Sequence, residues 1–454
     1  MTAEAVDESG TIAPEPAPVP LEVLIRATNT EDGTTYLYWL WLDDVAERFV
    51  HIITTEDLAS VTTRLAEAMI SGLPGETEDE SARRALVDGA LADRHAEKRL
   101  SSDLGALVLP PQFWVRLLRE AARTAVTLRI TPSRTLARVP WELMVAPHDG
   151  RRLVEIATLV YAGPSSSVNF DRARLPEPFD SSRPVLRTLD PVVPAGAGLG
   201  PVLSWNARTH LRNELGLDRA DVEPKRISRG DLRDLLQATE RPSRWIHVGH
   251  VSANDEAVGS AALHLTDEAT WYGWAEPVGP HRPLTALDLH LGTSKTEVRK
   301  PELWYPAEEK AVGAEIWPMP PRVAIIACDS GADHAGSETF GLVVTALISG
   351  AEYVTSTRWT VPTDEAFTRT HPELAGVLPT SDLIVAVDRA HAAEDPVAAL
   401  REWQLAKLRR WEVDGNIVDS PILFAGITTH HAPPRPELRS LDEAEKPATA
   451  MPEK

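Results

Sequence analysis

Cysteine is nearly absent from this chain of 454 residues, in which Cys328 is the only one. A single thiol excludes an intrachain disulfide, and it also excludes a zinc site built from several thiolates. A small secreted fold held together by disulfides is therefore ruled out. Any thiol chemistry of this chain depends on Cys328.

Long apolar runs and clusters of basic residues are lacking as well. No stretch of about 18 apolar residues occurs, so no transmembrane helix is expected. The formal net charge of −21 disfavours contact with nucleic-acid phosphates and with anionic lipid surfaces. Residues 1–20 have neither the basic start nor the apolar segment of a signal peptide. These absences predict a cytoplasmic protein that binds neither nucleic acid nor membranes.

Composition divides the chain into four parts and a linker. Residues 1–20 and 432–454 are rich in Pro, Glu and Ala, which predicts disordered tails. Residues 21–165 mix strand-like and helical patterns, and we expect an N-terminal α+β region there. The polar stretch 163–184 is typical of a linker. From 185 to 430, strands alternate with helices, which predicts an α/β domain with a mostly parallel sheet and helices on both faces.

The individual elements follow from hydrophobic periodicity. Runs rich in β-formers predict strands at 21–27, 35–42, 126–130, 154–162, 184–188, 224–228, 245–250, 322–327, 351–357 and 422–426. Helical spacing predicts helices near 56–71, 81–98, 110–124, 204–216, 229–239, 336–349 and 381–411. In a parallel sheet, the chemistry is expected at the carboxyl ends of the strands.

Two of the predicted strands end in reactive side chains. One ends in His250, and the other is followed by Cys328. If these strands are neighbours, their ends lie about 5 Å apart. An imidazole at that distance shifts a thiol toward the nucleophilic thiolate. The backbone amides of Cys328 and of Val251, the residue after His250, are candidate donors to an oxyanion.

A simpler interpretation remains open for the same residues. A lone cysteine after an apolar run is often a small buried hydrophobe. His247 lies on the same strand as His250 and, by alternation, on the opposite face, so either histidine is a candidate for a structural role. The pattern alone does not choose between a dyad and a packed core.

A family resemblance adds weight to the dyad. The segment 322–362, with Ile325-Ile-Ala-Cys-Asp-Ser-Gly331 at its centre, resembles the nucleophile motif of CHAT-domain proteins, which are caspase-like, separase-related cysteine peptidases. The strand Ile246-His-Val-Gly-His250 resembles the histidine strand of that family. Further similar segments, in the same order as in the family, are Leu136–Leu143 with its Pro-Trp-Glu-Leu sequence, Ala262–Asp267, Pro283–Leu289, Gly341–Leu347, Ser356–Asp364 and Ser420–Gly426.

The resemblance implies a caspase-like α/β/α sandwich, preceded by an N-terminal region that is itself an inactive caspase-like part or a cover. It implies His250 as the base and Cys328 as the nucleophile of a cysteine endopeptidase. It places Val251, Asp329, Ser330 and Gly331 at the oxyanion site or cleft.

The resemblance further implies that Trp359 and Asp364 line the substrate cleft. Core packing is the alternative for Trp359, and Glu142 is expected to be a structural partner. Neither a metal nor a cofactor is expected.

The expected partners are a protein or peptide substrate and an activating protein. Bacterial relatives tend to act as partner-activated effectors in defence systems.

One departure from the family keeps an alternative open. The family usually has glycine after the histidine, where this chain has Val251, and a β-branched side chain there resists positive φ. One alternative is therefore a catalytically inactive CHAT-like scaffold that binds protein partners. A separate alternative is a hydrolase or transferase that uses the same dyad on a small acyl substrate.

Overall fold

The structure is a computed structural model that describes residues 20–70, 73, 75–163, 175–252, 259–293, 313–327 and 339–432. The tails predicted to be disordered lie outside these residues, apart from Pro20 and Ala432. Cys328, Asp329, Ser330 and Gly331 also lie outside them.

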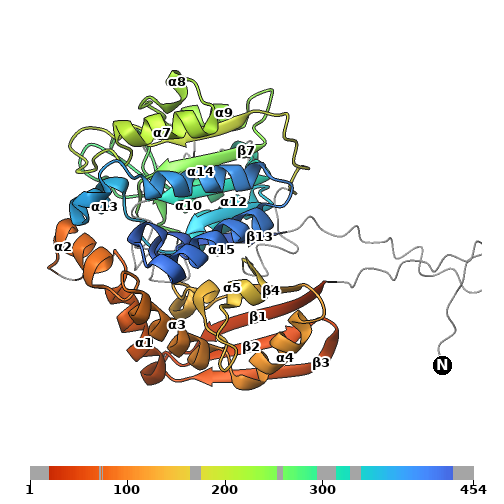
Figure 1. The fold of residues 1–454 in the computed structure, drawn as a ribbon. Coiled ribbons are helices and arrows are strands. Elements are labelled where there is room, and N and C mark those ends of the chain that lie inside the picture. Colours follow the sequence, from red (N-terminus) through yellow and green to blue (C-terminus); the bar gives the residue numbers. More distant parts are fainter. Residues whose placement is uncertain are drawn as a thin grey trace, which may run out of the picture.

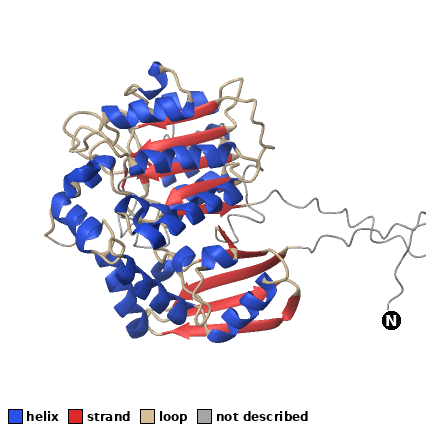
Figure 2. Ribbon diagram, viewed as in Figure 1, coloured by secondary structure: helices blue, strands red, loops and turns tan. Residues whose placement is uncertain are grey.

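One large sheet runs through the whole molecule (Figure 2). Its ten strands stand in the order β3-β2-β1-β4-β5-β13-β12-β11-β7-β6, and a small second sheet has the order β10-β9-β8. The strands are β1 Leu21–Asn29, β2 Thr35–Trp41, β3 Asp44–Ile53, β4 Val126–Thr131, β5 Thr158–Tyr161, β6 Val185–Leu189, β7 Arg244–Gly249, β8 Val251–Ser252, β9 Ala262–Leu263, β10 Leu284–Thr285, β11 Arg322–Ala327, β12 Tyr353–Thr357 and β13 Ile427–His431.

Helices cover both faces of the carboxyl-terminal half of this sheet. Helices α7, α14 and α15 cross the near face in Figure 1, whereas α9 and α12 pack on the other face. The helices are α1 Thr55–Glu67, α2 Glu78–Arg83, α3 Arg94–Val108, α4 Pro111–Ala121, α5 Leu153–Ile156, α7 Trp205–Leu215, α8 Arg219–Val222, α9 Arg229–Leu236, α10 Ala286–Leu291, α11 Gly313–Ile316, α12 Thr339–Ile348, α13 Asp364–Thr370, α14 Pro379–Ala392, α15 Pro396–Asp414 and α16 Pro421–Phe424. The α/β class and the mostly parallel sheet between helical layers are confirmed.

The apolar residues of each strand explain the layers. Ile246 and Val248 of β7 face the core that contains α7 and α14, while Trp245 faces the core that contains α9 and α12. Strand β11 alternates in the same way, and all six of its residues are buried. A strand that is buried on both faces has a nearly continuous apolar sequence. This is why β7 and β11 could be predicted from the sequence.

Some predicted elements differ from the structure. The segment 224–228 is not a strand, and Ile227 in it exchanges backbone and side-chain hydrogen bonds with Thr266. The run 422–426 contains helix α16 instead of a strand, because Pro421 starts a helical turn that Ser420 caps. The last strand is the next segment, β13.

The N-terminal strands join the carboxyl-terminal strands at one seam. There β13 pairs with β5 through His430 and Tyr161. Beside the seam, Nη2 of Arg358 donates to both carboxylate oxygens of Glu142 at 2.7 Å, and the hydroxyl of Tyr161 donates to the same carboxylate at 3.0 Å. All three side chains are buried. Glu142 therefore holds the Pro-Trp-Glu-Leu segment against the end of β12.

We expect Glu142→Ala to lower the free energy of unfolding by about 3–5 kcal/mol, because the substitution leaves the buried guanidinium of Arg358 without its counter-ion. Urea unfolding followed by circular dichroism measures the change. Glu223→Ala removes the exposed partner of Arg219 and is the control, with an expected cost below about 1 kcal/mol. Equal costs for the two variants would contradict the proposed importance of the seam.

Buried histidines make the fold sensitive to acid. His391 on α14 is fully buried, with its Nε2 2.7 Å from Oγ1 of Thr355, and burial lowers the pKa of His391 from 6.5 to about 3. The unfolded chain therefore protonates His391 as the pH falls below about 6.5, whereas the folded chain keeps this ring neutral. Stability from this site is complete above pH 6.5 and is lost as the pH falls toward 3.

His391→Gln is expected to reduce this loss by up to about 1.4 kcal/mol per pH unit between pH 6 and pH 4. Unfolding free energies measured at several pH values give the slope. His290→Gln alters an exposed histidine and is expected to leave the slope as it is. A slope in His391→Gln equal to that of the unmodified chain would show that His391 titrates normally in the fold.

Candidate active site

The candidate site begins at the parallel pairing of β7 with β11. Each residue of β7 has a partner in β11, ending with Gly249 opposite Ala327. His250 directly follows the first of these residues. Cys328 directly follows the second, in the sequence, and lies outside the described residues. The register thus brings the two chain segments to the same edge of the sheet.

A backbone carbonyl orients the His250 ring, which is only partly buried. Its Nε2 lies 2.7 Å from the carbonyl oxygen of Gly200. A carbonyl only accepts hydrogen bonds, so in the neutral ring Nε2 carries the proton and Nδ1 keeps its lone pair. His250 consequently presents Nδ1 as a proton acceptor, which is the state a general base needs.

Asp190 holds the loop that carries Gly200. Its carboxylate accepts hydrogen bonds from the amides of Val202 and Leu203 at 3.1 Å and from Nη2 of Arg208 at 2.6 Å. Its own amide donates to the carbonyl of Val248 on β7. Asp190 has a φ of +51°, a conformation that Asp tolerates better than most residues. The loop is therefore tied to the strand that carries His250.

Val251 turns its side chain into the core. It is 4% exposed and packs in the apolar cluster with Leu263 and Leu265. The amide of His264 donates to the carbonyl of His250, which makes Val251 and Leu263 a non-hydrogen-bonded pair of antiparallel strands. In such a pair the amide points away from the partner strand. The N–H of Val251 thus faces away from β9, and its φ is not positive.

A chain of polar side chains lies next to His250. Oγ of Ser252 is 2.7 Å from Nε2 of His264, and Nδ1 of His264 is 3.2 Å from Nε2 of His281. The rings of His250 and His264 meet edge to face, with centroids 6.4 Å apart. Burial lowers the pKa of His264 from 6.5 to about 3 and also lowers the pKa of His281. Both rings of the buried pair are neutral near pH 7.

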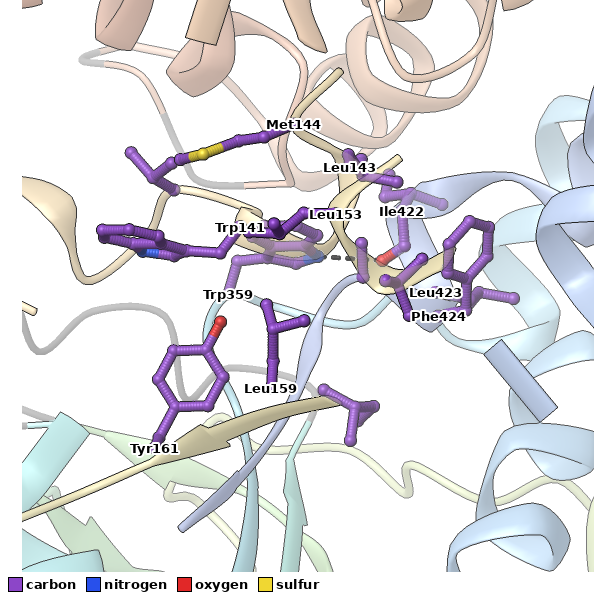
Figure 3. Close-up of a cluster of buried hydrophobic side chains, with 14 of the residues drawn as sticks. Trp141, Leu143, Met144, Leu153, Leu159, Tyr161, Trp359, Ile422, Leu423 and Phe424 are labelled. Atoms are coloured by element: carbon purple, nitrogen blue, oxygen red, sulfur yellow. Dashed lines mark hydrogen bonds between the residues drawn. The ribbon is translucent and has the colours of Figure 1, made fainter. Parts of the chain in front are cut away.

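Trp359 and Asp364 lie inside the structure. Trp359 is 1% exposed, and its Nε1 donates to the carbonyl of Ile422 at 2.8 Å (Figure 3). The carboxylate of Asp364 accepts hydrogen bonds from the amide of Thr380 and the hydroxyl of Ser381, at the start of α14. Burial raises the pKa of Asp364. These contacts favour core packing for Trp359 and helix capping for Asp364 over a role in a cleft.

The sequence did not reveal Gly200, Asp190 or His264 as neighbours of His250. Gly200 closes a stretch of three glycines that is typical of a loop, and no pattern links that loop to a strand some 50 residues later. Asp190 did carry a signal, since it lies two residues after the end of the predicted strand 184–188. The path of a loop decides which group contacts a polar residue at the carboxyl edge of the sheet. The spacing of residues in the sequence does not predict that path.

Across the described residues, no three His, Cys, Asp or Glu side chains are grouped so that they hold a metal ion. Within the same residues, no helix is long and apolar enough to span a bilayer.

We expect Asp190→Ala to release the Gly200 loop, because the substitution removes the acceptor for two amides and for Arg208. The neutral His250 ring should then lose its preference for a proton on Nε2. Nitrogen chemical shifts of the histidine rings, measured by NMR above pH 7.5, report this preference. Asp190→Asn keeps an acceptor oxygen and tolerates a positive φ, and it should retain the Nε2 proton. An unchanged tautomer in Asp190→Ala would contradict this role.

Comparison with known proteins identifies the family. A family model described as the CHAT domain matches residues 98–409. No curated protein matches the chain. Two crystal structures of the Saccharomyces cerevisiae separase–securin complex, at 2.6 and 3.0 Å resolution, share 7% and 9% identity with it, at TM-scores of 0.48 and 0.47. Each match covers 91% of this chain and 30% of the separase chain. The chain belongs to the CHAT domain family.

Proposed function

We propose that the chain is a cysteine endopeptidase in which Cys328 is the nucleophile and His250 is the general base. The observation that carries the proposal is the register of β7 and β11, which pairs the residues immediately before His250 and Cys328. Adjacent strands lie about 4.8 Å apart, and consecutive Cα atoms lie 3.8 Å apart. Membership of the CHAT family, whose peptidases use such a pair, supports the same assignment.

The orientation of His250 suits this role. With Nε2 donating to Gly200, the lone pair of Nδ1 accepts the thiol proton. The thiolate attacks the peptide carbonyl, and the protonated ring then gives its proton to the leaving amine. Water hydrolyses the thioester that results, with His250 again as the base.

Backbone amides stabilise the oxyanion of the tetrahedral intermediate. The N–H of Val251, which points away from β9, is one proposed donor, and the N–H of Cys328 is the other. We assign Asp329, Ser330 and Gly331 to the wall of the cleft beside the nucleophile. A valine after His250 is compatible with this arrangement, because its side chain is accommodated in the core.

The family further suggests how the activity is used. We propose a protein or peptide substrate, activation by a protein partner, and a role as a cytoplasmic effector in bacterial defence. The domain organisation belongs to the same proposal, with residues 185–430 as the catalytic part and 21–165 as an inactive, caspase-like part.

The single cysteine makes the dyad directly testable. The rate of alkylation of Cys328 by iodoacetamide is measured from pH 5 to pH 10 in the unmodified chain and in His250→Gln. An ordinary thiol, with a pKa near 8.5, is about 1% thiolate at pH 6.5. A dyad should therefore raise the rate at pH 6.5 at least about tenfold over His250→Gln.

His210→Gln is the matched control, since His210 lies on helix α7, where its Nε2 is 2.9 Å from Oδ1 of Asp382. Identical curves for the unmodified chain and His250→Gln would rule out the dyad. Peptidase activity is then read as new protein termini after incubation with a bacterial lysate, with Cys328→Ala as the blank. A reactive thiol that produces no new termini would support the scaffold or the small-acyl alternative instead.

A further inference from the structure

A second hydroxyl–imidazole pair lies beside His250, outside the proposed dyad. Ser252 ends β8 and is partly exposed, whereas His264 and His281 are at most 3% exposed. Ser252, His264 and His281 form one continuous chain of hydrogen bonds that ends on the carbonyl oxygen of Asp267. The proposed peptidase mechanism uses none of these groups.

The direction of every hydrogen bond in this chain follows from its last member. The carbonyl of Asp267 only accepts, so Nδ1 of His281, 2.7 Å away, carries the proton. Nε2 of the neutral His281 ring is then an acceptor, so Nδ1 of His264 donates to it. Nε2 of His264 is left with a lone pair, and the hydroxyl of Ser252 donates to that lone pair at 2.7 Å.

We propose that Ser252 is a second nucleophile, with His264 as its general base and His281 as the residue that orients the base. A hydroxyl donating to an imidazole that a third group holds in the correct tautomer is the arrangement by which serine is activated. The geometry depends on described residues alone and does not require Cys328.

The step is an ordinary acyl transfer. Oγ of Ser252 forms a bond to the acyl carbon of an ester, and the hydroxyl proton moves to Nε2 of His264. The bond from that carbon to the leaving oxygen breaks, and the alcohol leaves with the proton from His264. Water, activated by the same nitrogen, releases the acid and restores the hydroxyl.

The burial of His264 indicates which acyl donors suit the proposed Ser252 nucleophile. Burial keeps the ring in its unprotonated, accepting form, but the low pKa of His264 makes it a weak base. A weak base contributes at the low end of the usual 10²–10⁴-fold range for this kind of catalysis. The site is therefore suited to acyl donors with good leaving groups, such as aryl esters, and not to peptide bonds.

A fluorophosphonate probe tests the assignment. The full chain and Cys328→Ala are incubated with the probe, and mass spectrometry of peptides locates the modified residue. Oγ of Ser252 should displace fluoride at phosphorus in both proteins, at least about tenfold faster than Oγ of Ser228 reacts. Ser228 is the internal control, because its hydroxyl donates to a carboxylate, that of Asp231, and not to an imidazole.

His264→Gln should reduce modification of Ser252 at least about tenfold, and His281→Asn is the second variant in case the first does not fold. Circular dichroism and the melting temperature establish that each variant is folded. No modification of Ser252, or modification at the same rate in a folded variant, would overturn the proposal. Because Cys328→Ala is included, failure of this site is distinguishable from failure of the proposed dyad.

Discussion

The parallel pairing of β7 with β11 is the constraint on which the candidate site depends. A shift of one residue would separate Gly249 from Ala327 and would turn the buried side chains of the shifted strand to the wrong faces. Both strands are buried on two sides, so the packing of two cores resists such a shift. The stability of the sheet and the placement of His250 beside the segment leading to Cys328 are thus one and the same requirement.

The sheet places His250 at its edge, and polar contacts then fix the orientation of the side chains there. The carbonyl of Gly200 fixes which nitrogen of His250 carries a proton, and Asp190 fixes the loop that supplies the carbonyl. Next to His250, two neutral histidines hold the hydroxyl of Ser252 in a defined direction. The burial of His264 and His281 makes their hydrogen bonds specific, since an unpaired polar group there would cost free energy.

The sequence predicted the sheet and the two strands that precede His250 and Cys328, because buried parallel strands leave continuous apolar runs such as 322–327 and 245–250. It mistook 422–426 for a strand, whereas Pro421 starts a helical turn there that Ser420 caps. It left Trp359 open between the substrate cleft and the core, and the side chain is buried in the core. The sequence could not predict the paths of the loops or the tautomers of the histidines, since both depend on contacts between residues distant in the chain.

The seam between the two halves of the sheet has a consequence for how such a chain diverges. A carboxyl-terminal fragment that lacked Glu142 and β5 would expose the edge of β13. It would also leave the guanidinium of Arg358 without the carboxylate of Glu142. Recombination that moved the histidine and cysteine segments into another gene would therefore have to carry β5 and Glu142 with them. For CHAT domains built like this one, we expect the unit of inheritance to include this seam.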